Sequence, residues 1–382
     1  MKKTILTKVV PLSIAAVSTL GFAAGAQAMS FKVSGHIDRA LTYANNGENS
    51  AVGQVDNNGS DSRFRFTGSQ VMNNGMKVGF LYEMGIKKNS SSSWDIGSGT
   101  SNSNNAFNLR SAEAYLEGNF GKVSFGRGNS AAAYTETIDL SGTSWLGGGV
   151  WYELYSAGIT YVDGNGNSIA TIGQTQSPFQ FIGSRTNRVR YDTPSIGGLV
   201  FSGSYSEGNA YTVAARYKAT LMNGIKVAAG FGWADSENAG NVRDPGTWAI
   251  TSNGGFDTRS QTYGGSGSIL LPNGLNMTVS GTRAKQLATG ATAHNLFGQI
   301  GYIVGKNHFA VNYGQTKDKF VQGSKGSQIG VAYVYDWTHS VQLFASFHNY
   351  SLNLPSSYKV ANGYGSPNDI NQVYIGTRIK FL

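Results

Sequence analysis

The chain has 382 residues, a net charge of +9 and no cysteine, which excludes a disulfide framework and thiolate chemistry. It carries 52 glycines, 20 tyrosines and 19 phenylalanines but only 7 prolines, and beyond the N-terminus no apolar stretch is long enough for a transmembrane helix. This composition excludes a helical membrane protein and indicates many strands joined by glycine-rich turns.

The first 28 residues have the three-part layout of a secretory signal peptide. Three lysines precede an apolar run from Val9 to Ala24, and Ala26-Gln27-Ala28 follows as a cleavage site. A membrane anchor helix is disfavoured because the run is shorter than the roughly 20 residues needed to span a bilayer. We expect cleavage after Ala28, which leaves one domain, residues 29–382, with a net charge of +6.

The rest of the chain contains sixteen segments in which apolar residues alternate with small or polar ones. In one of them Ile225, Val227, Ala229, Phe231 and Trp233 occupy every second position, which is the side-chain period of a strand. The segments are residues 31–43, 62–70, 76–87, 107–119, 121–128, 186–193, 198–206, 211–221, 224–235, 258–271, 274–286, 294–305, 307–317, 326–337, 340–352 and 369–382. An even number of antiparallel strands places both chain ends on one side of a closed barrel.

The connections between these segments are of two kinds. Tight turns that need positive backbone angles are Asn73–Gly75, Gly118–Gly121, Met222–Gly224, Pro272–Gly274 and Gly305–Lys306. Long connections rich in Ser, Asn and Gly are Ala44–Asp61, Lys88–Ala106, Gly128–Arg185, Ala234–Asp257 and Leu354–Asn368. Outer-membrane barrels have short periplasmic turns on one rim and long external loops on the other. A soluble β-helix or adhesin stalk would show a fixed-period repeat, which is missing here. The sequence therefore predicts an all-β, transmembrane antiparallel β-barrel of 16 strands.

Arginines recur on the face opposite the apolar residues. Arg63 and Arg65 share one face of their segment, and Arg188 and Arg190 share one face of theirs. On the lipid face, each arginine near mid-membrane would cost roughly 2–4 kcal/mol. We therefore expect these side chains to point into the lumen, where Arg110 extends the basic wall.

Several motifs resemble those of the Gram-negative general porins. They are Ser62–Gly68, Leu109–Leu116 running into Phe120–Arg127, Asn187–Pro194 and the C-terminal strand Val373–Leu382, and together they cover the chain after the signal peptide. The resemblance implies a homotrimer of 16-stranded barrels in the outer membrane of a Gram-negative bacterium. The implied partners are outer-membrane lipid and lipopolysaccharide, the barrel-assembly machinery and small hydrophilic solutes.

The resemblance also implies a pore constriction. Its basic wall would comprise Arg63, Arg65, Arg110, Arg188 and Arg190, and the third long loop would fold into the lumen opposite them. The acidic candidates on this loop are Glu136, Asp139 and Glu153, and Gly147–Gly149 would allow a sharp bend. The segment Ser144–Gly148 lacks the acid that many relatives carry at the loop tip, so which carboxylate faces the arginines stays open. Opposed charges would create a transverse field that orients polar solutes.

Glu113 does not fit the alternation. With Arg110 facing inward, strict alternation turns Glu113 toward lipid, where a carboxylate is costly. Either the strand contains a bulge, or this face lies in a subunit interface. We expect the interface, because the first strands of porin trimers pack against the neighbouring subunits.

The predicted function is passive diffusion of small hydrophilic solutes and ions across the outer membrane, with a weak preference for anions. A substrate-specific porin for a sugar or an anion is the alternative. An outer-membrane protease or phospholipase is a remote one, because no convincing pairing of a histidine with a catalytic serine or acid is found.

No cofactor, metal or nucleic acid is expected. Asp163–Asn167 resembles the opening of a calcium loop, but Ser168 replaces the required glycine and Gln174 replaces the bidentate glutamate, so a plain turn is expected.

The C-terminus differs from the usual pattern in one respect. General porins usually end on the aromatic residue that helps assembly machinery recognise them. Here Phe381 holds the apolar register and Leu382 follows it. Phe381 is therefore the predicted assembly signal.

Overall fold

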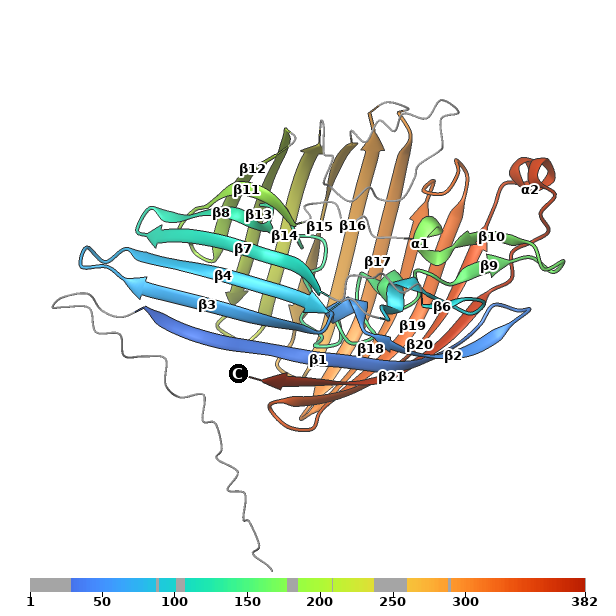
Figure 1. Ribbon diagram of the computed structural model, residues 1–382, viewed down its shortest axis with the longest axis horizontal. Helices are drawn as coiled ribbons and strands as arrows, with labels where there is room; N and C mark the ends of the chain where they lie inside the picture. Colours follow the sequence, from blue (N-terminus) through green and yellow to red (C-terminus); the bar gives the residue numbers. More distant parts are fainter. Residues whose placement is uncertain are drawn as a thin grey trace, which may run out of the picture.

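The computed structural model describes residues 29–86, 89–100, 107–176, 185–207, 209–236, 260–287 and 290–381. Its main feature is a closed antiparallel barrel (Figure 1). The predicted signal peptide, residues 1–28, lies outside the described residues. No helix in the described ranges is long and apolar enough to cross a membrane.

Sixteen strands of the described chain form the wall, each paired with its neighbours along the chain. They are β1 (Ser30–Asn45), β3 (Arg63–Val71), β4 (Lys77–Ile86), β7 (Phe107–Gly118), β8 (Gly121–Asn129), β11 (Arg185–Asp192), β12 (Leu199–Ser206), β13 (Ala210–Thr220), β14 (Lys226–Ser236), β15 (Ser260–Leu270), β16 (Leu275–Gln286), β17 (Thr292–Val304), β18 (Asn307–Lys317), β19 (Lys325–Asp336), β20 (Val341–Asn353) and β21 (Ile370–Phe381). Pairing of β21 with β1 closes the barrel, and Gly35 opposite Phe381 places both ends at one rim. The predicted barrel and strand number are confirmed.

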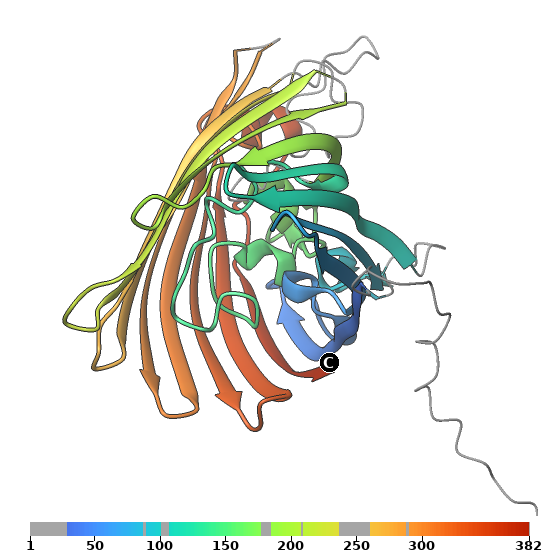
Figure 2. The same ribbon diagram turned by 90° about the vertical axis from the view of Figure 1, so that its left-hand side faces the viewer.

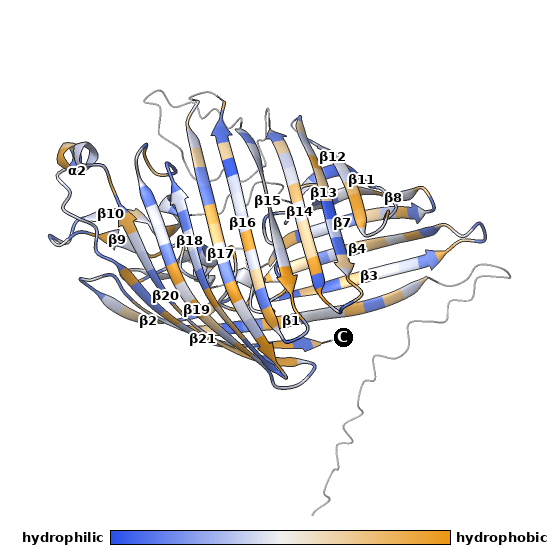
Figure 3. Cartoon of the chain, turned by 180° about the vertical axis from the view of Figure 1, so that it is seen from behind, coloured by the Kyte–Doolittle hydropathy of each residue, from blue (hydrophilic) through white to orange (hydrophobic). Residues whose placement is uncertain are grey.

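The two faces of the strands differ in polarity, as the alternation predicted. Along β16, Met277 and Val279 are exposed on the outside, whereas Thr278 and Ser280 are buried on the inside. Figure 3 shows hydrophobic and hydrophilic residues alternating along the strands of this side of the barrel. An outward apolar face suits lipid, and inward hydroxyls can bind water or the loops inside the lumen.

The short turns lie together on one rim, as predicted. Gly75, Gly224 and Gly274 have φ values of 80°, 80° and 91°, which is the left-handed region that the predicted turns require. The long connections leave the opposite rim. The second one carries η2 (Ser91–Ser93), β5 (Trp94–Asp95) and β6 (Gly99–Thr100), and the last one carries α2 (Ser356–Asn362).

The expectation that Ala44–Asp61 is only a loop is wrong. It contains β2 (Ser50–Asp56), which pairs with β1 across Arg39–Asn45, while β3 pairs with β1 across Ser30–His36. Thus β2 and β3 follow one another along the same edge of β1. The one-turn helix η1 (Asn58–Ser60) interrupts them. The sequence pattern hid β2 because its side chains alternate weakly.

The third long loop folds into the lumen, as the family resemblance implied (Figure 2). It carries η3 (Tyr152–Tyr155), β9 (Thr160–Val162), β10 (Ser168–Thr171) and α1 (Ile172–Thr175). Gly147 and Gly149 bend it with φ values of 101° and 110°. Its buried tyrosines form an apolar core with Phe297, Tyr350 and other inward side chains of β17–β21. The loop therefore fills this part of the lumen.

Candidate functional site

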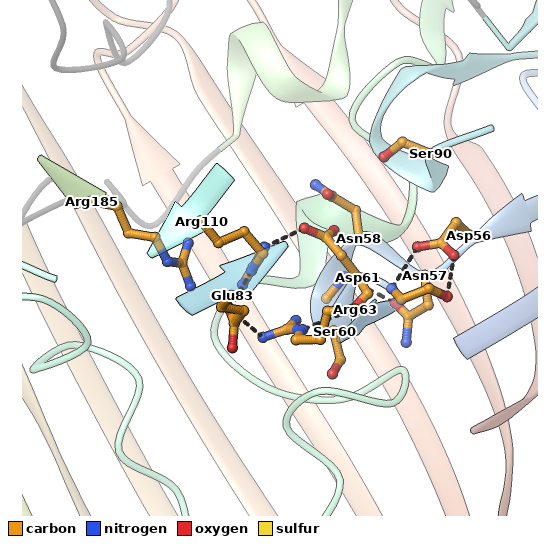
Figure 4. A network of polar contacts seen from close by, with 12 residues as sticks. Asp56, Asn57, Asn58, Ser60, Asp61, Arg63, Glu83, Ser90, Arg110 and Arg185 are labelled. Carbon is orange, nitrogen blue, oxygen red and sulfur yellow. Dashed lines mark hydrogen bonds and ion pairs between the residues drawn. The ribbon is translucent and has the colours of Figure 1, made fainter. Parts of the chain in front are cut away.

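Three of the predicted arginines converge on one carboxylate. Arg110 Nε donates to Glu83 Oε1 (2.6 Å), Arg65 Nε donates to Glu83 Oε2 (2.9 Å), and Arg63 Nη1 lies 3.6 Å from Glu83 Oε1. Arg110 also forms an ion pair with Asp61 (Figure 4). The side chains of Arg110 and Glu83 are buried, while that of Arg65 is 43% exposed. The basic wall is therefore an ion-pair network.

A bulge in β7 produces this arrangement. Glu83 pairs with Ser111 and the next residue, Met84, pairs with Leu109, so Arg110 is an extra residue in its strand. The bulge turns both Arg110 and Glu113 inward.

The preferred explanation of Glu113, a subunit interface, is therefore wrong. Glu113 forms an ion pair with Arg188, whose side chain is 3% exposed. The side chains meet over Gly126 and Gly128 of the intervening β8, and a Cβ on Gly128 would lie 2.3 Å from the Glu113 carboxylate. The bulge, the other explanation that the sequence left open, is correct: it places the Glu113 carboxylate inside the barrel and not in lipid.

The interruption between β2 and β3 supplies Asp61. Asn57 caps η1 by accepting from Gly59 N (3.0 Å), and its amide donates to Asp38 (3.1 Å) and to the Trp145 carbonyl (2.9 Å). These bonds connect the first loop to the third. Asp61 follows directly and faces Arg110.

Arg188 and Arg190 lie on the inner face of β11, as expected, but separate from the cluster around Glu83. Each has its own carboxylate, because Arg190 pairs with Asp192 at 2.7 Å. Arg185, at the start of β11, is close enough to interact electrostatically with Arg110, Asp61 and Glu83. The sequence reading missed Asp61, Glu83 and Arg185. Glu83 had a usable signal, since it occupies the polar register of its strand.

Arg63, Arg65, Arg110 and Arg185 are hereafter the arginine cluster. Two carboxylates, Asp61 and Glu83, face these four cations, which leaves a local charge of +2. The neighbouring pairs Arg188–Glu113 and Arg190–Asp192 are neutral overall. The net charge of these arginines together with their carboxylates is therefore positive but modest.

The three loop carboxylates do not face the arginine cluster, contrary to expectation. Asp139 accepts from Thr278 Oγ1 and Gln299 Nε2, both at 2.9 Å, which fixes the loop to β16 and β17. Glu153 is 3% exposed, within η3. Glu136 is fully buried, and its carbonyl accepts from Ser280 of β16. Burial keeps Glu136 and Glu153 away from the arginine cluster, whereas Asp139 is held by its hydrogen bonds to β16 and β17.

Burial raises the pKa of Glu136 to about 8, and the partly opposing charge is Arg216. When the loop is docked this carboxyl stays neutral up to about pH 8, whereas in an undocked loop it would ionise above its ordinary pKa of about 4.5. Docking of the loop is therefore strongest below about pH 4.5, where the carboxyl is neutral in both states. Docking should weaken as the pH rises from there through 8. We expect Glu136→Gln to remain docked at pH 9, where the wild-type loop loosens. Single-channel conductance recorded from pH 5 to pH 9 would test this, and identical profiles for the two proteins would contradict it.

From the third loop, aromatic side chains rather than its acids lie beside the arginine cluster. The ring of Trp151 lies 5.3 Å from those of Tyr134 and Trp145, and Arg185 donates to the Tyr134 hydroxyl at 2.6 Å. All three rings are partly exposed. Tyr134 has a φ of 65°, which is uncommon for a residue other than glycine. The sequence offered one signal for these aromatic rings, Trp145, which lies in the segment that lacks the expected acid.

The remaining candidate sites are structural. Asp163 accepts from the amides of Asn165, Asn167 and Gly365, which forms a turn that joins the third loop to the last. Within the described ranges, no group of three or more His, Cys, Asp or Glu residues is placed to hold a metal ion.

The comparisons with known proteins agree with this geometry. A family model described as Gram-negative porin matches residues 13–353. No curated protein matches the chain in sequence. The anion-selective porin from Comamonas acidovorans superposes with a TM-score of 0.61 at 18% identity, covering 93% of this chain and 100% of that one. OmpT of Vibrio cholerae, in a trimer form, gives 0.55 at 12% identity, with 93% and 100% covered. OmpF of Salmonella typhi, in complex with daunomycin, gives 0.55 at 15% identity, with 92% and 97% covered. At these identities the structural likenesses show the fold.

Proposed function

The chain belongs to the Gram-negative porin family and is an outer-membrane diffusion channel, and we propose that its arginine cluster gives this channel a weak preference for small hydrophilic anions. The observation that carries the proposal is the local charge of +2 beside the lumen-filling loop. A fixed positive charge in a low-dielectric cleft raises the local concentration of anions. The compensating carboxylates keep the preference weak.

Planar bilayers with a potassium chloride gradient test the proposal. The expected result is steady conductance with a reversal potential shifted toward the equilibrium potential of chloride. This shift should be largest at low salt, because screening of the fixed charges is then weakest. A reversal potential shifted toward the equilibrium potential of potassium would refute the anion preference. Failure to conduct ions would refute the channel itself.

A second candidate, a substrate-specific porin, is favoured by one observation. Tyr134, Trp145 and Trp151 present partly exposed rings next to Arg185. Rings stack on sugars or planar solutes while an arginine binds an anionic group. Saturable block of the current by a sugar phosphate, but not by chloride or phosphate, would favour this candidate. The family favours either channel over an outer-membrane enzyme.

We also propose a homotrimer in the outer membrane, exported with cleavage after Ala28. Glu113 no longer supports a subunit interface, because its carboxylate is paired inside the barrel. The support is instead the family and the trimer form of Vibrio cholerae OmpT. Native mass measurement of the purified protein tests the proposal, and a monomer only would refute it.

Phe381 stays the predicted assembly signal. It is 44% exposed on the outer face, and its ring covers Gly35 of β1. We expect Phe381→Ser to reduce insertion in cells, whereas deletion of Leu382 should leave it intact. Folding into detergent micelles in vitro serves as the control, since lost packing against Gly35 would impair both. Normal insertion of Phe381→Ser in cells would place the signal elsewhere.

A further inference from the structure

The third loop brings three aromatic rings together inside the barrel. The ring centres of Tyr134, Trp145 and Trp151 lie 5.3, 5.3 and 6.1 Å apart, and Trp145 stands edge-on to the other two. All three rings are partly exposed, whereas Tyr152 and Tyr155 of the same loop are buried in its apolar core. Because the loop lies in the lumen, the exposed parts of the rings open to the lumen and not to lipid. A solute that crosses the channel can therefore reach them.

Contacts from other elements hold the backbone that carries these rings. The Asn57 amide of the first loop donates to the Trp145 carbonyl at 2.9 Å. Arg216 of β13 donates to the carbonyl of the residue before Tyr134 at 2.6 Å. Trp151 directly precedes η3, and its side chain packs against the apolar core of the loop. A site that is held in place before the solute arrives loses little conformational entropy on binding.

Arg185 stands beside the Tyr134 ring. Its Nη2 donates to the Tyr134 hydroxyl at 2.6 Å, and its guanidinium carbon lies 5.9 Å from the ring centre. Its side chain lies next to that of Arg110 (Figure 4). The other three members of the arginine cluster pair with Asp61 or Glu83, whereas no carboxylate of the described chain forms an ion pair with Arg185. Its positive charge is therefore available to an anionic group of a solute.

The charged groups beside the rings favour a solute whose polar group only accepts hydrogen bonds. A guanidinium donates and cannot accept, and the carboxylates Asp61 and Glu83 are buried and already accept from arginines. A sugar presents several hydroxyls, which need acceptors as well as donors. A carboxylate only accepts, and its two oxygens match the fork of an arginine. The site therefore suits a flat apolar body joined to a carboxylate better than it suits a sugar.

We propose that the lumen of this protein binds aromatic carboxylates, of which benzoate is the simplest, with the carboxylate on Arg185 and the ring against Tyr134 and Trp151. The proposal rests on the second candidate function and names its substrate class. The 5.9 Å between the Arg185 guanidinium and the Tyr134 ring centre is short enough for one small molecule to contact both. Aromatic rings attract one another at centre distances of about 4.5–7 Å. Such contacts are strong enough to collect the solute and weak enough to release it, as passage through a channel requires.

The first experiment compares four solutes as blockers of the chloride current in planar bilayers. Benzoate has both proposed features, cyclohexanecarboxylate has the charge without an aromatic ring, benzamide has the ring without the charge, and glucose 6-phosphate is an anionic sugar. We expect benzoate to block saturably, with a half-blocking concentration about tenfold below that of each of the other three. Equal block by benzoate and cyclohexanecarboxylate would show that the rings do not contribute, and would overturn the proposal.

The second experiment tests whether the block arises at these residues. Trp151→Leu keeps an apolar side chain but removes the ring, and should raise the half-blocking concentration of benzoate several-fold. Arg185→Gln removes the charge and should raise it about tenfold, which abolishes the advantage of benzoate over benzamide. Tyr302→Leu on the outer face and Lys306→Gln at a periplasmic turn make matched changes outside the site and should be blocked like the wild type. Wild-type block in both Trp151→Leu and Arg185→Gln would overturn the proposal.

The outcomes separate this inference from the proposed function. An anion-selective channel without saturable block by benzoate would retain the proposed function and refute the aromatic site alone. Block by glucose 6-phosphate but not by benzoate would keep a substrate-specific channel and assign the rings to a sugar, which also refutes this inference. A protein that fails to conduct ions would refute the channel and the aromatic site together.

Discussion

Replacing Arg63 and Arg185 by glutamate is expected to reverse the ion preference of the channel from anions to cations. The double substitution changes the local charge from +2 to −2, because Asp61 and Glu83 remain while two cations become acids. These two arginines are the suitable choice. Arg63 is the more distant partner of Glu83, at 3.6 Å, and Arg185 donates to the neutral hydroxyl of Tyr134. Arg110 is left in place because it binds both carboxylates.

Reversal potentials in planar bilayers under a potassium chloride gradient measure the effect. Arg185→Glu alone should give an almost unselective channel, since it reduces the local charge to zero. Lys306→Glu, with the same change of charge at a periplasmic turn, serves as the control and should keep the wild-type preference. The effect should shrink in concentrated salt, where the Debye length is about 3 Å at 1 M. A double variant that stays anion-selective at low salt would show that the arginine cluster does not set the preference.

Tyr152→Ala is expected to release the third loop from the wall and to raise single-channel conductance. Tyr152 is fully buried, with its ring stacked on Phe297 at 6.3 Å between ring centres and tilted against Tyr350 at 6.4 Å. Truncation of such an aromatic costs about 3–5 kcal/mol, which here acts on the docking of the loop because the strands keep their ladders. The released loop should also become sensitive to protease.

A second variant tests the same contact from the wall. A Cβ on Gly314 of β18 would lie 2.2 Å from the Tyr152 ring, so Gly314→Leu should expel the ring and give the same larger conductance. Tyr302→Ala, on the outer face of β17, removes a tyrosine from the same region without touching the loop. If both loop variants conducted like the wild type, the loop would be held by its other contacts, such as those of Asp139 and Gln176.

The strand count and the inner and outer faces of the wall followed from the alternation of residues. Each barrel strand is apolar on one side because that side faces lipid, so a two-residue period is visible without knowledge of neighbouring strands. The lumen positions of Arg63, Arg65, Arg188 and Arg190 followed from the same period. Lengths of connections likewise identified the rim with the short turns.

Features that break the period were not predictable in the same way. A one-residue bulge at Arg110 reverses the direction of every later side chain in its strand, and the sequence only showed that Glu113 did not fit. Likewise, β2 is too weakly alternating to separate from a loop, although the interruption after it supplies Asp61.

By itself, the sequence determined the barrel, its number of wall strands and the face on which each arginine lies, while the family resemblance implied which loop enters the lumen. Only the tertiary structure decided the partners of those arginines, the burial of Glu136 and Glu153, the bonding of Asp139 to β16 and β17, and the aromatic rings beside the arginine cluster. The reason is physical. A strand period is a local property of one segment, whereas an ion pair or a docked loop depends on distances between segments that the barrel brings together from far apart in the chain.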